Sequence, residues 1–128
     1  MPSRILIVDD EVNHRKALAI CLRIEGYTVL EAEDGRAALE LLAHEEVDMA
    51  IVDLMMPGIN GLDLCRRMRF RHPAVPIVLT SAYHLSQRQL DRAEIRVLGF
   101  LPKPFEMNEL VEFLRASLAA SLSDAVAG

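Results

Sequence analysis

Short, continuous hydrophobic runs recur along the chain and alternate with segments of helical periodicity. Continuous rather than alternating hydrophobicity is typical of strands that are covered on both faces, as in a parallel sheet. Five strands are therefore predicted, at residues 4–8, 27–32, 47–52, 75–80 and 97–101.

The segments that follow these runs carry apolar residues at helical spacing. Gly26 predicts the end of the first helix, and Asp34 predicts the N-cap of the second. The first helix is expected to bury a face that contains Ala17, Leu18 and Cys21. Five helices are predicted: residues 12–25, a segment after Asp34, and residues 62–70, 86–96 and 107–122.

This alternation predicts an α/β domain with a doubly wound, five-stranded and mostly parallel sheet. Crossovers in such sheets are nearly always right-handed, and sites form beyond the carboxyl ends of the strands. Polar residues that directly follow a strand should therefore converge at one end of the sheet, although they are far apart in sequence. The residues concerned are Asp9, Asp10, Asp53, Ser81 and Lys103.

Length and composition fit a single domain, because the chain has 128 residues of which 52% are hydrophobic. The stretch at residues 123–128 consists of small residues and one Asp, and it is predicted to be a tail or the start of a linker. Residues 1–122 are then expected to form the domain.

Charge and hydropathy make several classes of partner improbable. The formal net charge is -5 with no run of five Lys or Arg, which argues against nucleic-acid binding, and the cluster Arg66-Arg67-Met68-Arg69 is predicted to be a solvated helix face. No apolar stretch approaches the roughly 20 residues of a membrane span, and a secretory leader is not expected, because residues 1–4 lead straight into a strand-like run. A cytoplasmic location is expected, with Cys21 and Cys65 as free thiols.

Asp53 stands at the end of an apolar run and before a Pro57-Gly58 turn, where a charge is poorly placed for packing and well placed for chemistry. If Asp9 and Asp10 join it, carboxylates about 4 Å apart repel one another by roughly 1 to 4 kcal/mol per pair. Mg²⁺ suits such hard oxygen ligands and commonly bridges carboxylates to a phosphate. Lys103 could add a second positive charge.

Carboxylates of this kind can form aspartyl phosphates, and phosphoryl transfer requires mainly positioning and charge neutralisation. The Ser81 hydroxyl could donate a hydrogen bond to the transferred group. Taken singly, each feature also has a plain interpretation: Asp9-Asp10-Glu11 as an acidic helix start, Lys103 as a charged turn, Ser81 as a strand-end hydroxyl. Their joint occurrence at the ends of four predicted strands favours the functional interpretation.

Four segments of the chain resemble the motifs of receiver domains of two-component response regulators, in order and at family spacing, from about Arg4 to Leu118. They are Ile5-Leu6-Ile7-Val8-Asp9-Asp10-Glu11, Asp53-Leu54-Met55-Met56-Pro57-Gly58 with Gly61, Pro76-Ile77-Val78-Leu79-Thr80-Ser81-Ala82, and Lys103-Pro104-Phe105. The resemblance implies a flavodoxin-like fold of receiver type.

It also implies a metal-dependent phosphorylation site. Asp53 would be the phosphoacceptor, Asp10 a direct ligand of Mg²⁺ or Mn²⁺, and Asp9 a ligand that acts largely through water. The backbone carbonyl of Met55 would complete the protein's share of the metal shell.

The switch residues follow from the same resemblance. Ser81 rather than Thr80 falls at the position of the switch hydroxyl, Phe100 at that of the switch aromatic, and Lys103-Pro104 is expected to be a cis peptide. Phosphorylation by a sensor histidine kinase or phosphotransfer protein would change the surface of the fourth helix, fifth strand and fifth helix. That surface would control a downstream protein or an output domain, or would form a phosphorylation-dependent homodimer.

The resemblance describes a signalling module rather than an enzyme with a separate substrate. Two other classes are weaker: a haloacid-dehalogenase-like phosphatase needs a second Asp where Met55 stands, and nucleotide-binding enzymes need glycine-rich loops that the chain lacks. A receiver-like module that is never phosphorylated stays open. On the last helix, Phe113 falls outside the apolar stripe and is expected to be exposed, either near the output surface or as a lone surface aromatic.

Overall fold

The computed structural model describes residues 2–56, 58–82 and 97–127, and it describes side chains up to residue 118. The described part contains one five-stranded sheet with the order β2-β1-β3-β4-β5, and every neighbouring pair is parallel. The predicted helix at residues 86–96 lies outside the described residues. The elements are β1 (Arg4–Val8), α1 (Val12–Ile24), β2 (Thr28–Ala32), α2 (Gly35–His44), β3 (Met49–Asp53), α3 (Gly61–Arg71), β4 (Ile77–Ser81), β5 (Gly99–Pro102) and α5 (Met107–Ala127).

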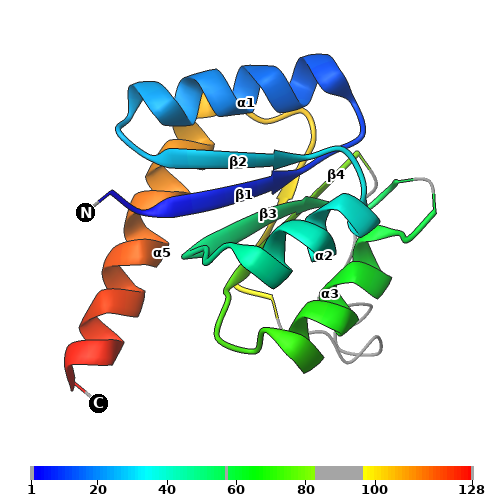
Figure 1. Ribbon diagram of the computed structural model, residues 1–128. Coiled ribbons are helices and arrows are strands. Elements are labelled where there is room, and N and C mark those ends of the chain that lie inside the picture. Colours follow the sequence, from blue (N-terminus) through cyan, green and yellow to red (C-terminus); the bar gives the residue numbers. More distant parts are fainter. Residues whose placement is uncertain (1, 57, 83–96, 128) are drawn as a thin grey trace.

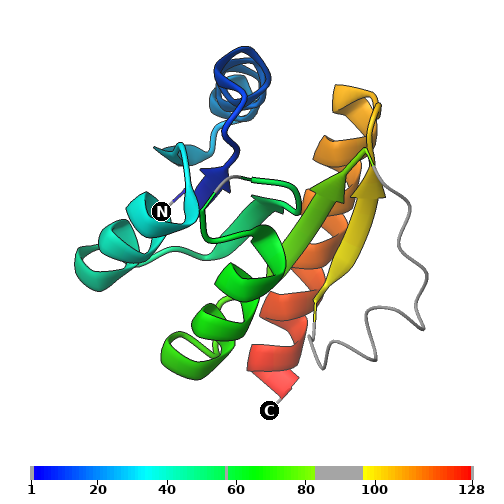
Figure 2. The same ribbon diagram turned by 90° about the vertical axis from the view of Figure 1, so that its right-hand side faces the viewer.

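The sheet lies between two layers of helices: α1 and α5 cover one face, and α2 and α3 cover the other (Figures 1 and 2). Successive residues of each strand point to opposite faces, so the central strands are buried on both. On β1, for example, Leu6 and Val8 pack toward α2 and α3, whereas Ile5 and Ile7 pack toward α1 and α5. This confirms the doubly wound fold predicted from the continuous hydrophobic runs.

Two helices begin where polar side chains accept hydrogen bonds from otherwise unpaired backbone amides. The Asp34 side chain accepts from Ala37 N at 2.8 Å, as predicted, and the Asn60 side chain accepts from Asp63 N at 2.9 Å. Gly26 has φ +97° after α1, a conformation that favours glycine. Local sequence thus fixes these boundaries.

The predicted buried face of α1 is wrong in part. The helix buries Leu18, Ala19 and Leu22, whereas Ala17 is exposed and Cys21 is half-buried. The sequence from Ala17 to Leu22 is apolar at every position, so its periodicity does not determine how the helix is rotated. Contact with the sheet and with α5 selects the face.

Helix α5 continues to Ala127, past the predicted end at Leu122. The exposure predicted for Phe113 is wrong. Its side chain is half-buried and its ring packs against Gly99 of β5, in the space that a side chain at residue 99 would otherwise occupy. Because Gly99 leaves that space empty, an aromatic outside the main stripe of α5 still reaches the sheet.

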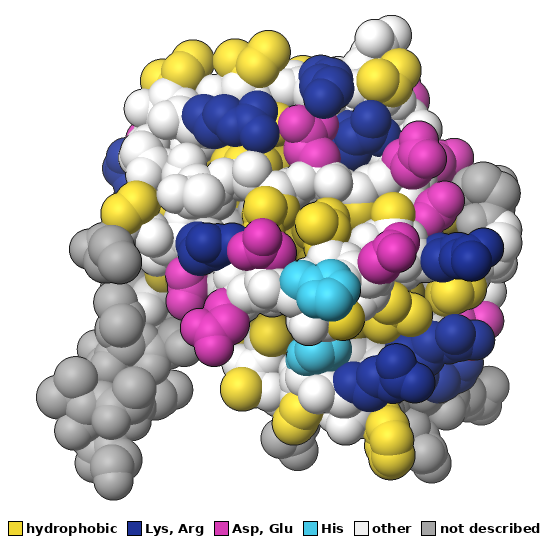
Figure 3. Space-filling model, viewed as in Figure 1, with side chains coloured by type: hydrophobic (Ala, Val, Ile, Leu, Met, Phe, Trp, Pro, Cys, Tyr) yellow, Lys and Arg dark blue, Asp and Glu magenta, His cyan; other side chains and the backbone are white. Residues whose placement is uncertain are grey.

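Arginine side chains gather over α3, where Figure 3 shows a group of dark blue side chains at the lower right. Arg66 and Arg67 are exposed, as predicted for a solvated helix face, whereas Arg69 is half-buried and Met68 is buried. Cys65 is buried and Cys21 is half-buried, and both are free thiols. Among the described helices, none combines the length and apolar character that a membrane span requires.

Candidate functional site

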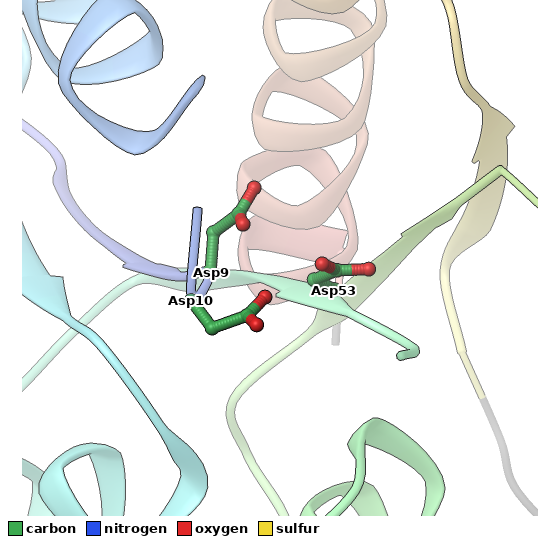
Figure 4. A group of neighbouring side chains, drawn as sticks. All are labelled: Asp9, Asp10 and Asp53. Atoms are coloured by element: carbon green, nitrogen blue, oxygen red, sulfur yellow. The ribbon is translucent and has the colours of Figure 1, made fainter. Parts of the chain in front are cut away.

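Three carboxylates meet at the carboxyl end of the sheet: Asp9 and Asp10 follow β1, and Asp53 is the last residue of β3 (Figure 4). One oxygen from each lies within 4.8 Å of the others. Asp9 and Asp53 are buried, with 2% and 6% of their surface exposed, whereas Asp10 is exposed. The sequence prediction that these residues converge is confirmed.

Strand register explains the convergence. β1 and β3 are paired so that Val8 lies opposite Val52, and the next residue on each strand is therefore a carboxylate, Asp9 or Asp53. Asp53 in turn lies opposite Thr80 of β4. Parallel neighbouring strands that end at the same level thus bring together Asp9 and Asp53, which are 44 positions apart in the sequence.

Asp53 has few partners for a buried carboxylate. Its Oδ1 accepts a hydrogen bond from Met55 N at 3.2 Å, and its Oδ2 lies 3.5 Å from Lys103 Nζ. Burial raises the pKa of Asp53 above its ordinary value, and the positive charge of Lys103 and the Met55 amide offset this only in part. The neighbouring charge of Asp9 raises the pKa further.

Asp9 is held at both side-chain oxygens. Its Oδ1 accepts from Glu11 N at 2.9 Å, and its Oδ2 accepts from His14 Nδ1 at 2.6 Å and from Lys103 Nζ at 3.3 Å. Its backbone carbonyl accepts from Arg15 at 2.8 Å. Burial by itself would raise the pKa of Asp9, but the hydrogen bonds from His14 and Glu11 and the charge of Lys103 outweigh it, so the pKa is lowered.

Sequence reasoning missed His14 and Arg15. Both lie in the first turns of α1 and point back to the end of β1, where they contact Asp9. A signal was available, because a helix that starts directly after a strand-end carboxylate brings its first turns beside that carboxylate. Periodicity alone does not tell which residues of those turns face it.

Lys103 joins the two buried carboxylates. Its ammonium group pairs with Asp9 and with Asp53, and only 17% of its side chain is exposed. Its backbone amide donates to the Ser81 carbonyl at 2.7 Å, which ties the end of β5 to the end of β4. The Lys103-Pro104 peptide bond is cis, the conformer that the family resemblance implies.

The hydroxyl and aromatic positions lie on the neighbouring strands. Ser81 is fully buried at the end of β4, opposite Pro102. Phe100 lies on β5 opposite Leu79, is half-buried, and packs against the cluster that faces α2 and α3. Met55 lies two residues after Asp53, and it is 54% exposed. Phe113 lies apart from the carboxylates, against Gly99.

The donor set fits a hard divalent cation. All three side chains offer carboxylate oxygens, which Mg²⁺ and Mn²⁺ prefer. Among the described residues, Lys103 is the one cationic side chain that forms an ion pair with Asp53. Burial, together with the neighbouring charge of Asp9, keeps the pKa of Asp53 raised although Lys103 is close. A divalent ion at Asp9, Asp10 and Asp53 would supply the missing positive charge.

A family comparison identifies the chain. The model of the response regulator receiver domain matches residues 5–115. The chain belongs to this family. Receiver domains act in phosphorylation-dependent signalling by two-component systems, so the phosphatase and nucleotide-binding alternatives do not apply.

Relatives of this receiver domain are longer proteins. It is 38% identical over 128 residues to the response regulator MprA of Mycolicibacterium vanbaalenii, a match that covers 100% of the chain and 55% of the relative. It is 40% identical to the alkaline phosphatase synthesis transcriptional regulatory protein SphR of Synechococcus elongatus, covering 93% of the chain and 50% of the relative. The chain thus spans about half the length of these relatives.

Solved structures share the fold. A CheY-like receiver domain from Methanospirillum hungatei superposes with a TM-score of 0.88 at 23% identity, covering 97% of this chain and 99% of that one. The response regulator TrrA of Thermotoga maritima, solved in complex with Mg²⁺-BeF, gives a TM-score of 0.80 at 34% identity, covering 90% and 98%. The acidic cluster of this receiver domain is consistent with metal binding of that kind.

Proposed function

We propose that this receiver domain is a phosphorylation switch in which Asp53 accepts a phosphoryl group in a Mg²⁺-dependent reaction. The observation that carries the proposal is the position of Asp53 at the end of β3. There it forms an ion pair with Lys103 and lies beside the Asp9 and Asp10 carboxylates. Mn²⁺ would serve in place of Mg²⁺, because both prefer oxygen ligands. TrrA, a protein 34% identical to this chain, was solved with Mg²⁺ and a fluoroberyllate, which supports the same chemistry here.

The donor would be a phosphohistidine on a sensor histidine kinase or a phosphotransfer protein. An Asp53 carboxylate oxygen forms the new bond to phosphorus while the bond between phosphorus and the histidine nitrogen breaks, and the released imidazole keeps the electron pair of that bond. When bound, the metal neutralises phosphoryl oxygens. Asp10 and the Met55 carbonyl would hold it directly, and Asp9 largely through water.

The remaining roles fall to residues of the neighbouring strands. Lys103, already placed between Asp9 and Asp53, would turn to a phosphoryl oxygen. The Ser81 hydroxyl would donate to the phosphoryl group, and Phe100 would turn inward on β5. Such a change shifts a population that already exists, rather than creating a new structure.

The readout would be the surface of β5, α5 and the helix predicted at residues 86–96. Phe113 would belong to this surface as a residue packed on β5, and not as an exposed contact. Residues 1–122 would form the receiver unit in the cytoplasm. Its partner would be a downstream protein, an output domain like those expected in the longer relatives, or a second phosphorylated copy.

The test is phosphorylation of the purified chain by acetyl phosphate with Mg²⁺, read by intact mass, with beryllofluoride as a stable mimic. The wild type should gain one phosphoryl group, and both Asp53→Asn and chelation of the metal should abolish the gain. Asp63→Asn is the matched control, because Asp63 is an exposed carboxylate on α3 that pairs with Arg66 away from the site. An unmodified wild type would show instead a module that is never phosphorylated, and an undiminished gain in Asp53→Asn would show that Asp53 is not the phosphoacceptor.

A further inference from the structure

His14 belongs to none of the motifs that identify the family, yet it makes the shortest hydrogen bond to a site carboxylate. Its Nδ1 donates to Asp9 Oδ2 at 2.6 Å, and its side chain is 23% exposed. On its other side, its ring meets that of Phe105 edge to face, with ring centroids 5.7 Å apart and an interplanar angle of 72°. These two contacts restrict the position of the imidazole.

Asp9 Oδ2 is shared between His14 and Lys103, at 2.6 and 3.3 Å. The two partners are not equivalent, because Lys103 also pairs with Asp53 at 3.5 Å and would turn to the phosphoryl group once Asp53 is modified. Of these two partners, His14 alone would then remain hydrogen-bonded to Asp9 Oδ2. A buried carboxylate with fewer partners adopts more orientations, and the metal shell depends on one of them.

We propose that His14 is a positioning residue that keeps the Asp9 carboxylate oriented for the metal, and that this role becomes larger when Lys103 turns to the phosphoryl group. The inference rests on the proposed function, since it requires a divalent ion at Asp9 and Asp10. Phe105 supports this role, because its ring contacts the imidazole of His14. It follows Lys103 by two residues, so the loop that carries the lysine also restrains the imidazole. Phe105 is half-buried and cannot replace the donor.

Two substitutions separate the donor from the ring. His14→Phe keeps a planar ring against Phe105 and removes the hydrogen bond. His14→Asn keeps a nitrogen donor at the same distance from the backbone as Nδ1 and removes the ring. If His14 acts by packing alone, His14→Phe should weaken Mg²⁺ binding less than His14→Asn does. If His14 positions Asp9, His14→Asn should weaken Mg²⁺ binding less.

The measurement is Mg²⁺ affinity of the whole chain by isothermal titration calorimetry, without phosphodonor. His14→Phe should weaken Mg²⁺ binding about tenfold, as expected for loss of a partner that orients a metal ligand, and His14→Asn should stay within about threefold of the wild type. Urea unfolding in EDTA checks that each variant is folded. Equal affinities of His14→Phe and the wild type, or a weaker affinity for Asn than for Phe, would overturn the inference.

A second measurement uses the state in which Lys103 is engaged elsewhere. With beryllofluoride present, the weakening caused by His14→Phe should exceed the weakening seen with Mg²⁺ alone. An effect that is no larger with beryllofluoride than with Mg²⁺ alone would overturn the inference. Failure of the proposed function looks different, because the wild type itself would then bind neither Mg²⁺ nor beryllofluoride at Asp53.

Discussion

The ends of β1 and β3 each place a buried carboxylate beside Lys103, but the protein treats the two charges differently. At the end of β1, Asp9 is held by side-chain and backbone donors, and its pKa is lowered. At the end of β3, Asp53 has one backbone donor and a longer ion pair, and its pKa is raised. Burial raises the pKa of both residues, so the difference comes from the hydrogen bonds to Asp9 and from the charges beside each carboxylate.

This difference separates a structural carboxylate from a reactive one. The donors around Asp9 lower the energy of its charge and restrict the orientation of its carboxylate, which suits it to orient a cation. Asp53 keeps lone pairs to which no other described residue donates, and its charge is poorly compensated, as a nucleophile requires. Stability measurements on the metal-free protein can test this contrast.

The largest effect is expected from Gly61→Ala, which tests how the end of β3 is held. An added Cβ would stand 2.5 Å from Leu54 Cα and against the Asp53 carbonyl oxygen, so the backbone that carries Asp53 would have to shift. We expect a loss of about 3 kcal/mol in unfolding free energy, measured by urea denaturation in EDTA. Gly58→Ala is the control from the same loop: it meets open space but has φ +74°, which gives a loss of about 1 kcal/mol. Equal losses would show that Gly61 does not hold this strand end.

Neutralising each carboxylate separately should give opposite signs. Asp9→Asn disturbs a buried site with three donors, and we expect it to lower the unfolding free energy by about 2 kcal/mol at pH 7 in EDTA. Asp53→Asn removes a charge that burial disfavours, and we expect it to raise the unfolding free energy by about 1 kcal/mol. Urea denaturation of both variants measures the pair. A similar loss in both would break the contrast.

The smallest effect is in the pH dependence of these differences. The folded pKa of Asp53 lies above its ordinary 3.8, so Asp53 contributes stability that is present below pH 3.8 and is lost as the pH rises through the folded pKa. Asp9 has a lowered pKa and contributes stability that is present above pH 3.8 and is lost as the pH falls through its folded pKa. Relative to Asp53→Asn, the wild type should therefore gain about 1 kcal/mol as the pH falls from 7 toward 4. A constant difference across this range would contradict the raised pKa.

The fold could be predicted from the sequence because its strands are buried on both faces, which leaves continuous hydrophobic runs. The convergence of Asp9, Asp53 and Lys103 followed from strand ends alone. The rotation of α1 did not follow, because residues from Ala17 to Leu22 are all apolar and only the sheet selects among them. For the same reason the contact between His14 and Asp9 was not predicted.

Phe113 shows a different limit of sequence patterns. The stripe on α5 left Phe113 out, although Phe113 packs against the same core cluster as Met107 and Leu118. The pattern of one helix contains no information on gaps in the surface opposite. The gap comes from Gly99, on another element, and the ring fills it. The structure is needed to see that a large side chain on one element fills the space left by a glycine on another.

That pairing of Gly99 with Phe113 couples the two positions as objects of mutation. A side chain introduced at residue 99 has to displace the ring, and a smaller residue at 113 leaves a hollow above β5. Each substitution is therefore expected to be tolerated best together with its counterpart, such as Gly99→Ala with Phe113→Leu. Across relatives, the sizes of the residues at these two positions should vary in opposite directions, so that the sum of their volumes changes less than either one.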